Sequence, residues 1–204
     1  MNEFKYLMIG GGITAVNALR GIREKDKNGL IAILTKESFP PYSRPPLSKD
    51  LWKGKSADTI WLPIEDQGTE VFTDHQVIAL NLEEKSVTTQ NKEEFHYQTL
   101  LLAMGTEPKH LRFSDNDIIY YRDYADYLKL KELVEKADNF AVIGAGFIGS
   151  EIAAALNLNN KKVTILESGT GIGWRVFPPE IVEYLNDFYQ TKGVKVIEGA
   201  NIRD

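Results

Sequence analysis

The stretch AVIGAGFIG at residues 141–149 decides the fold of this chain. A short apolar run leads there into glycines spaced G-x-G-x-x-G, and residues 150–158 continue with a helical pattern. A second apolar run follows at residues 163–166, so strand, glycine turn, helix and strand succeed one another as in a βαβ unit. In this setting the spacing predicts a dinucleotide site, because the turn lets a pyrophosphate approach the backbone and the helix N-terminus offers it free N–H groups.

The start of the chain carries the same pattern. YLMIGGGITA at residues 6–15 runs through Gly10-x-Gly12-x-x-Ala15 into a helical pattern over residues 13–23, and an apolar run follows at residues 30–34. The repeat predicts an α/β fold with two tandem Rossmann-like dinucleotide-binding units. Two such sites on one chain suggest two different dinucleotides, one flavin and one nicotinamide.

Between the two glycine turns the pattern changes to short strands. Residues 71–72, 77–80, 86–89 and 95–102 alternate with turn residues, and the charged residues 83–85 suit an exposed hairpin tip. We therefore expect an antiparallel β-meander inserted into the first unit. The apolar run at residues 100–103 predicts a strand end that is buried on both faces. Further helices are predicted at residues 126–137 and 181–192, and a strand at residues 194–197, which leaves the second unit incomplete.

An acidic residue is expected at the end of the second strand of each unit, where it accepts a hydrogen bond from a ribose hydroxyl. Glu167 directly follows residues 163–166 and favours NADH over NADPH, because a carboxylate repels a 2′-phosphate. Arg175 weakens that preference, since an arginine accommodates a phosphate. In the first unit Glu37 is the candidate, with Lys36 in the usual acidic position and a solvated surface charge as the alternative interpretation.

Composition excludes several other functions. The chain has 204 residues, a net charge of -5 and no cysteine, which rules out disulfides, a dithiol centre of its own and zinc ribbons. The acidic balance argues against a nucleic-acid partner, and no apolar run is long enough to span a membrane. The three histidines match no metal-ligand spacing, so no metal site is expected. Trp52, Trp61 and Trp174 are interpreted as packing residues, with a position beside a cofactor as the alternative for Trp52.

The segment PYSRPPLSKDLW at residues 41–52 is the most specific stretch of the chain. Four prolines within residues 40–46 are expected to exclude helix and to form a stiff, ordered loop. With this segment and VIGAGFIGSE at residues 142–151, the chain resembles the two-dinucleotide flavoprotein reductases, whose fold is that of glutathione reductase and the pyridine nucleotide-disulfide oxidoreductases. Within them it is most similar to the branch of apoptosis-inducing factor, the ferredoxin and rubredoxin reductases and monodehydroascorbate reductase.

The resemblance runs from Tyr6 to the end of the chain and implies a domain division. An FAD-binding domain is expected at residues 1–122 and a truncated NAD-binding domain at residues 123–204. Relatives continue beyond this point, so the chain is expected to be the N-terminal portion of a longer protein. Met104 departs from the usual Ala-Thr-Gly strand end and is left out of the expected site.

The resemblance also implies which residues bind each cofactor. For FAD these are Gly10, Gly12, Ile13, Thr14, Ala15, Glu37, Arg44, Lys49, Val77 and Arg122. For NAD they are Gly144, Gly146, Phe147, Ile148, Gly149, Glu167 and Arg175. Lys49 and Glu151 are the expected catalytic residues: Lys49 stabilises the negative charge of reduced flavin, and Glu151 points toward the nicotinamide and pairs with Lys49. An ordinary surface charge is the alternative interpretation of each.

The expected activity is an FAD-dependent NADH oxidoreductase that passes electrons to an external acceptor such as ferredoxin, rubredoxin or a quinone-like compound. The alternatives are a redox sensor or scaffold of the apoptosis-inducing-factor type with slow turnover, and a catalytically inert fragment. No presequence is visible, so a cytoplasmic location is expected, or a mitochondrial one if a presequence was removed. The acceptor and the oligomeric state are not readable from the sequence.

Overall fold

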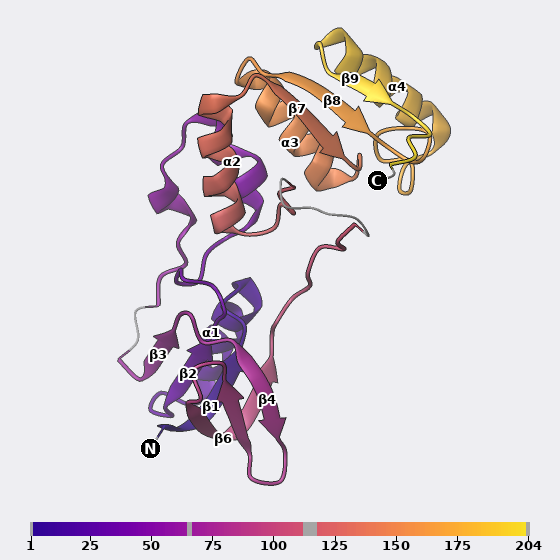
Figure 1. The fold of residues 1–204 in the computed structure, drawn as a ribbon. Helices are drawn as coiled ribbons and strands as arrows, with labels where there is room; N and C mark the ends of the chain where they lie inside the picture. The colour runs from indigo at the N-terminus through magenta and orange to yellow at the C-terminus, as the bar shows by residue number, and fades with distance from the viewer. Residues whose placement is uncertain (1, 65–66, 112–117, 203–204) are drawn as a thin grey trace. The chain divides into compact units, whose positions relative to one another are not determined.

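A computed structural model describes residues 2–64, 67–111 and 118–202 (Figure 1). The chain divides into two compact units, which are considered one at a time. Unit 1 comprises Met1–Ser43 and Ala57–Glu107, and unit 2 comprises Arg44–Ser56 and Pro108–Asp204. The two units therefore interleave in sequence. The predicted division into an FAD-binding domain at residues 1–122 and an NAD-binding domain at residues 123–204 stays a prediction.

A six-stranded sheet forms unit 1, in the order β3-β2-β1-β6-β5-β4. Its central strand β1 pairs in parallel with β2 and β6, and β2 pairs in parallel with β3. The strands β4, β5 and β6 pair antiparallel in chain order, as the predicted meander requires, but they extend the same sheet. The bounds are β1 Asn2–Ile9, α1 Ile13–Lys25, β2 Ile31–Leu34, β3 Thr69–Phe72, β4 Val77–Asn81, β5 Ser86–Thr89 and β6 Glu94–Leu102.

The core of unit 1 follows from this strand order. Every residue of β2 is fully buried, because a hydrophobic cluster covers each face of the strand: Ala32 and Leu34 belong to one, and Ile31 and Ile33 to the other. Helix α1 contributes Ala15, Val16 and Leu19 to the buried set. The carboxyl end of β6 differs from the prediction, because Leu102 is 54% exposed. Residues 94–96 of β6 pair with β5 on one side. The later residues of β6 pair with β1 on the other side and with no described strand on the β5 side, so the end of β6 lies at an edge of the sheet.

The proline-rich segment also differs from the prediction, because it contains short helices. Two 3-10 turns, η1 Pro45–Ser48 and η2 Asp50–Lys53, follow one another, and η3 spans Ala57–Ile60. Pro45 and Pro46 occupy the first positions of η1, where a missing backbone N–H removes no intrahelical hydrogen bond. The prolines therefore start a helical turn there.

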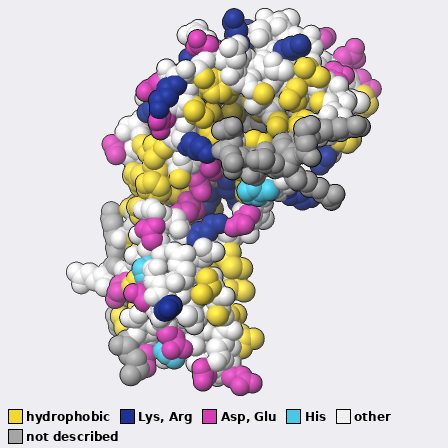
Figure 2. Space-filling view, in the orientation of Figure 1, with side chains coloured by type: hydrophobic (Ala, Val, Ile, Leu, Met, Phe, Trp, Pro, Cys, Tyr) yellow, Lys and Arg dark blue, Asp and Glu magenta, His cyan; other side chains and the backbone are white. Residues whose placement is uncertain are grey.

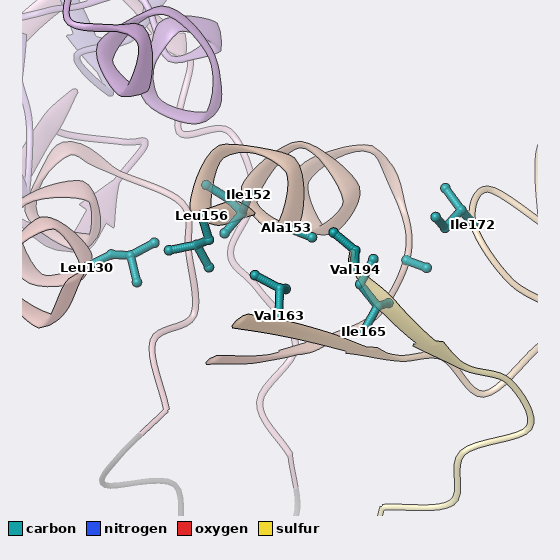
Figure 3. Close-up of a cluster of buried hydrophobic side chains, with 9 residues drawn as sticks. Leu130, Ile152, Ala153, Leu156, Val163, Ile165, Ile172 and Val194 are labelled. Carbon is teal, nitrogen blue, oxygen red and sulfur yellow. The ribbon is translucent and has the colours of Figure 1, made fainter. Parts of the chain in front are cut away.

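Unit 2 has a parallel three-stranded sheet in the order β7-β8-β9. Helix α3 packs on the sheet: Ile152, Ala153 and Leu156 point toward Val163 and Ile165 of β8 (Figure 3). Helix α2 starts earlier than predicted, since Asp123 and Asp126 form a reciprocal capping box there. The bounds are α2 Tyr124–Lys136, β7 Asn139–Ile143, α3 Phe147–Leu158, β8 Lys162–Leu166, α4 Pro179–Thr191 and β9 Lys195–Ile197.

Partly buried hydrogen bonds hold the segment Arg44–Ser56 within unit 2. The carbonyl oxygen of Leu47 accepts hydrogen bonds from the Trp52 indole at 2.7 Å and the Tyr121 hydroxyl at 2.6 Å. The Trp52 ring meets the edge of Tyr127 with centroids 5.4 Å apart. Burial raises the pKa of Tyr121 above its ordinary value, so its hydroxyl remains a donor.

Hydrophobic side chains also reach the surface, interspersed with charged ones (Figure 2). Among the helices that the structure describes, none has the length and apolar character needed to cross a bilayer.

Candidate functional site

The glycine turn of unit 1 joins β1 to α1. Gly10 has φ of 114°, and a Cβ placed on it would lie 2.6 Å from the carbonyl carbon of Ala103, so no other residue fits this turn. A Cβ on Gly12 would meet no described atom within 4 Å, which leaves room for a phosphate in front of the helix. Ile13 and Thr14 are exposed, and Ala15 is fully buried where α1 meets the sheet.

The glycine turn of unit 2 joins β7 to α3, and here the third glycine of the motif is the tight position. A Cβ on Gly149 would lie 3.1 Å from the carbonyl carbon of Gly144 and closer still to its oxygen, so Gly149 is needed for α3 to approach the turn. A Cβ on Gly144 or Gly146 would meet no described atom within 4 Å. Phe147 and Ile148 follow in the first turn and are 60% and 44% exposed.

Both helix N-termini suit an anion. The first turns of α1 and α3 carry no acidic side chain, and neither N-cap glycine blocks the free N–H groups with a side chain. The open Gly12 and Gly146 positions and these N–H groups fit the pyrophosphate of a dinucleotide in each unit.

A cavity of about 470 Å³ opens at the glycine turn of unit 2. Gly144, Ala145, Gly146 and Phe147 line one part of it, and Glu167 lines another at the end of β8. Trp174 and Arg175 also line this cavity, so the structure brings the predicted pair Glu167 and Arg175 to one site.

The Glu167 carboxylate is 6% exposed and is held by several donors. Its Oε2 accepts from the backbone N–H of Ala145 at 2.6 Å. Its Oε1 accepts at 3.0 Å from the Ser168 hydroxyl, the Gly169 N–H and the Trp174 indole N–H. Burial raises the pKa of Glu167, but these hydrogen bonds outweigh it, so the pKa lies below its ordinary value.

The sequence analysis missed the loop that follows Glu167. Gly169, Gly171 and Gly173 alternate there; Gly171 and Gly173 have φ of 131° and 71°, and the Gly173 N–H donates to the Ala145 oxygen at 2.9 Å. Buried Asn186 of α4 holds the loop, donating to the Thr170 oxygen and accepting from the Ile172 N–H. Three alternating glycines after the acidic residue were the available signal.

Trp174 differs from its predicted role as a packing residue. It is 38% exposed and lies on the cavity wall, because the glycine loop turns it back toward Glu167. By contrast, Trp52 packs against the core of unit 2, as predicted.

The predicted catalytic residues meet in unit 2. The Lys49 Nζ lies 2.9 Å from Glu151 Oε1, and the Ser48 hydroxyl donates to Glu151 Oε2 at 2.6 Å. Ser48 is buried, whereas the Lys49 side chain is 49% exposed, so its ammonium is anchored on one side and accessible on another. The expected pairing of Lys49 with Glu151 is therefore present, and it was Ser48 that the sequence did not single out.

The other predicted FAD residues are divided between the units. In unit 2, an Arg44 guanidinium nitrogen donates to the Arg122 carbonyl oxygen at 3.1 Å. In unit 1, Glu37 follows the end of β2 and accepts a hydrogen bond from the Tyr42 hydroxyl. Val77 is the first residue of β4 and packs against the core of unit 1. The roles of these residues toward FAD stay predictions.

Comparison with known proteins identifies relatives of about twice the length. Apoptosis-inducing factor 1, mitochondrial, of Dictyostelium discoideum is 32% identical over 100% of this chain and 43% of its own. Monodehydroascorbate reductase of Pisum sativum is 30% identical over 98% of this chain and 52% of its own. The 5,5′-dehydrodivanillate O-demethylase ferredoxin reductase subunit of Sphingobium sp. is 34% identical over 96% of this chain and 50% of its own. The chain thus spans about half the length of the curated relatives it matches.

Solved structures share the fold. A ferredoxin reductase from Rhodopseudomonas palustris matches with a TM-score of 0.89 at 26% identity, over 100% of this chain and 52% of that one. NADH:rubredoxin oxidoreductase from Clostridium acetobutylicum matches with a TM-score of 0.87 over 98% of this chain and 53% of that one; its 24% identity supports the fold alone.

The family assignment follows from the sequence match. Residues 4–204 match the pyridine nucleotide-disulphide oxidoreductases, whose members use FAD and NAD(P)H. The predicted family, the α/β fold class and the use of FAD with NAD(P)H are confirmed, whereas the details of the two tandem units and the preference for NADH stay predictions. With its two glycine turns and its match over nearly the whole length, the chain belongs to the pyridine nucleotide-disulphide oxidoreductase family.

Proposed function

We propose that this chain is the FAD- and NADH-binding portion of a reductase that passes electrons to an external acceptor such as ferredoxin, rubredoxin or a quinone-like compound. The observation that carries the proposal is the pair of glycine turns, each with an open position in front of a helix N-terminus. The relatives named as ferredoxin and monodehydroascorbate reductases support an oxidoreductase role.

In this proposal the two glycine turns bind the cofactor phosphates. Gly12 and the N–H groups of residues 13–15 bind the FAD pyrophosphate, and Gly146 with residues 147–149 binds that of NADH. Glu167 accepts from a ribose hydroxyl through Oε2, which has Ala145 as its one donor among the described residues. Bound FAD supplies the hydride acceptor, and this chemistry requires no general base from the protein.

Lys49 and Glu151 supply fixed charge. Glu151 holds the Lys49 ammonium from one side, and Ser48 fixes the second carboxylate oxygen of Glu151. A cation held in one orientation costs little reorganisation when negative charge develops beside it. Trp52 and Tyr121 fix the Leu47 carbonyl and thereby the backbone that carries Ser48 and Lys49.

The test is to add NADH anaerobically to the chain reconstituted with FAD and to follow the flavin absorbance. We expect bleaching of the oxidised flavin, which returns when an electron acceptor is added. A chain that binds FAD but is not bleached by excess NADH would contradict the proposal. The same assay on Lys49→Met distinguishes the effect of the Lys49 charge on flavin reduction from its effect on cofactor binding.

The relationship to apoptosis-inducing factor favours a second candidate, a redox sensor or scaffold with slow turnover. Fast steady-state NADH oxidation with a ferredoxin, rubredoxin or quinone-like acceptor supports the reductase. A long-lived reduced complex and slow turnover with all three support the sensor. We propose a cytoplasmic location, although the names of relatives include mitochondrial, peroxisomal and cytosolic forms.

A further inference from the structure

Trp174 lies on the wall of the cavity at the glycine turn of unit 2 and contacts Glu167 there. Its indole N–H donates to Glu167 Oε1 at 3.0 Å, and a Cβ on Gly169 would overlap its ring. The absence of a side chain at Gly169 therefore lets the indole lie against the loop and reach the carboxylate. Trp174 thus joins a polar contact with Glu167 to an aromatic ring on the cavity wall.

The hydrogen bonds at Glu167 leave little acceptor capacity toward a ligand. A carboxylate oxygen has two lone pairs, and Oε1 already receives three donors: Ser168, Gly169 and Trp174. Glu167 can therefore receive a ribose hydroxyl through Oε2. The same donors offset part of its negative charge, which weakens its repulsion of a phosphate.

A cation lies on the same wall of the cavity. The Arg175 guanidinium carbon is 5.1 Å from the centroid of the Trp174 ring, which is the geometry of a cation–π pair. Arg175 and Glu167 both line the cavity. Trp174 thus contacts both charged groups that a 2′-phosphate would meet.

We propose that Trp174 is a positioning residue that sets coenzyme selectivity: by donating to Glu167 and carrying Arg175, it makes the cavity accept NADPH as well as NADH. This inference rests on the proposed function of the cavity. It predicts a weaker preference for NADH than an unrestrained glutamate at this position would give. Removing the indole N–H leaves more of the negative charge of Glu167 Oε1 unopposed, and therefore strengthens discrimination against the 2′-phosphate.

The experiment measures the dissociation constants of NADH and NADPH by calorimetry with the full chain. In the unsubstituted protein we expect the dissociation constants of NADH and NADPH to lie within about tenfold of each other. A factor of about ten corresponds to the free energy of one hydrogen bond to a charged group. Trp174→Phe keeps a ring beside Arg175 but removes the N–H, and should raise the ratio of NADPH to NADH dissociation constants by about tenfold. Trp61→Phe, in unit 1, is the matched control and should leave the ratio unchanged.

The outcomes separate this inference from the proposed function. If neither coenzyme binds the unsubstituted chain, the proposed function fails. If both bind but Trp174→Phe weakens them equally, Trp174 has a structural role and the inference is overturned. Should Trp174→Phe not fold, Ser168→Ala removes another donor from Oε1 and must shift the ratio in the same direction, again by about tenfold. An unchanged ratio in Ser168→Ala then overturns the inference.

Discussion

Two glycines of one turn should respond differently to the same substitution, one mainly in stability and the other mainly in binding. Gly149→Ala places a methyl group 3.1 Å from the carbonyl carbon of Gly144 and closer still to its oxygen, and a backbone carbonyl cannot swing away. Such overpacking costs about 3 kcal/mol, at the upper end of its usual range. Alanine in a helix returns about 1 kcal/mol relative to glycine, so the net loss is about 2 kcal/mol.

Gly146→Ala should behave differently, because its methyl group would meet no described atom within 4 Å. Gly146 is the N-cap of α3, where alanine is less favourable than glycine by about 0.5 kcal/mol. The methyl group occupies the space that a phosphate needs, so NADH affinity should fall by about tenfold or more. Gly149→Ala thus mainly affects folding, and Gly146→Ala mainly affects binding.

The assay combines thermal unfolding with calorimetric titration of NADH. Gly149→Ala should lower the melting temperature by roughly 10 °C for a unit of this size, and Gly146→Ala by about 3 °C. Gly21→Ala is the matched control: it lies within α1, has an open Cβ position and should be neutral or stabilising. Equal destabilisation by Gly149→Ala and Gly146→Ala, or tight NADH binding by Gly146→Ala, would refute the reasoning.

Three further predictions concern charged and buried groups. Lys49→Met should change the melting temperature by less than about 5 °C, because a half-exposed ion pair is worth about 0.2–1 kcal/mol. The same substitution should slow the bleaching of bound FAD by NADH. Equal bleaching rates in the two proteins would contradict the role of Lys49. Tyr121→Phe should cost about 1 kcal/mol in chemical denaturation, since it leaves the Leu47 carbonyl with one donor fewer. The pKa of Glu167 is lower in the folded state than its ordinary value of 4.5, so the ionised carboxylate stabilises the fold above that pH, and this stabilisation is lost as the pH falls through the folded-state pKa. The difference in unfolding free energy between the unsubstituted chain and Glu167→Gln should therefore shrink on acidification. A difference that stays constant with pH would contradict this prediction.

The sequence predicted those parts of the fold that depend on local patterns. The glycine turns at Gly10 and Gly144 and the helices after them were predictable, because strand, turn and helix signals lie within a few residues of each other. Glu167 was placed at the cavity for the same reason, since it directly follows a strand. The exposure of Leu102 depends on which strands pair beside it, which no local pattern reports.

Contacts between distant residues were not predictable in the same way. Trp174 reads as a core residue from its type, and its role arises from a turn of the glycine loop that brings its N–H to Glu167. Ser48 gives no sequence signal, because its partner Glu151 lies far along the chain. Such polar pairings depend on tertiary geometry and not on residue spacing.

The interleaving of the two units constrains how the chain reaches its native state during synthesis. Trp52 packs in unit 2, and its carbonyl oxygen accepts a hydrogen bond from Asn159 at 3.3 Å. A ribosome adds about 5–20 residues per second, so Trp52 leaves the peptidyl-transferase centre roughly 5–20 s before Asn159 is made. The indole must stay unburied, or be shielded by a chaperone, while the meander of unit 1 is translated. Early residues of this chain are therefore a point of vulnerability to aggregation on the ribosome, and slowing translation between them should lower the yield of native protein.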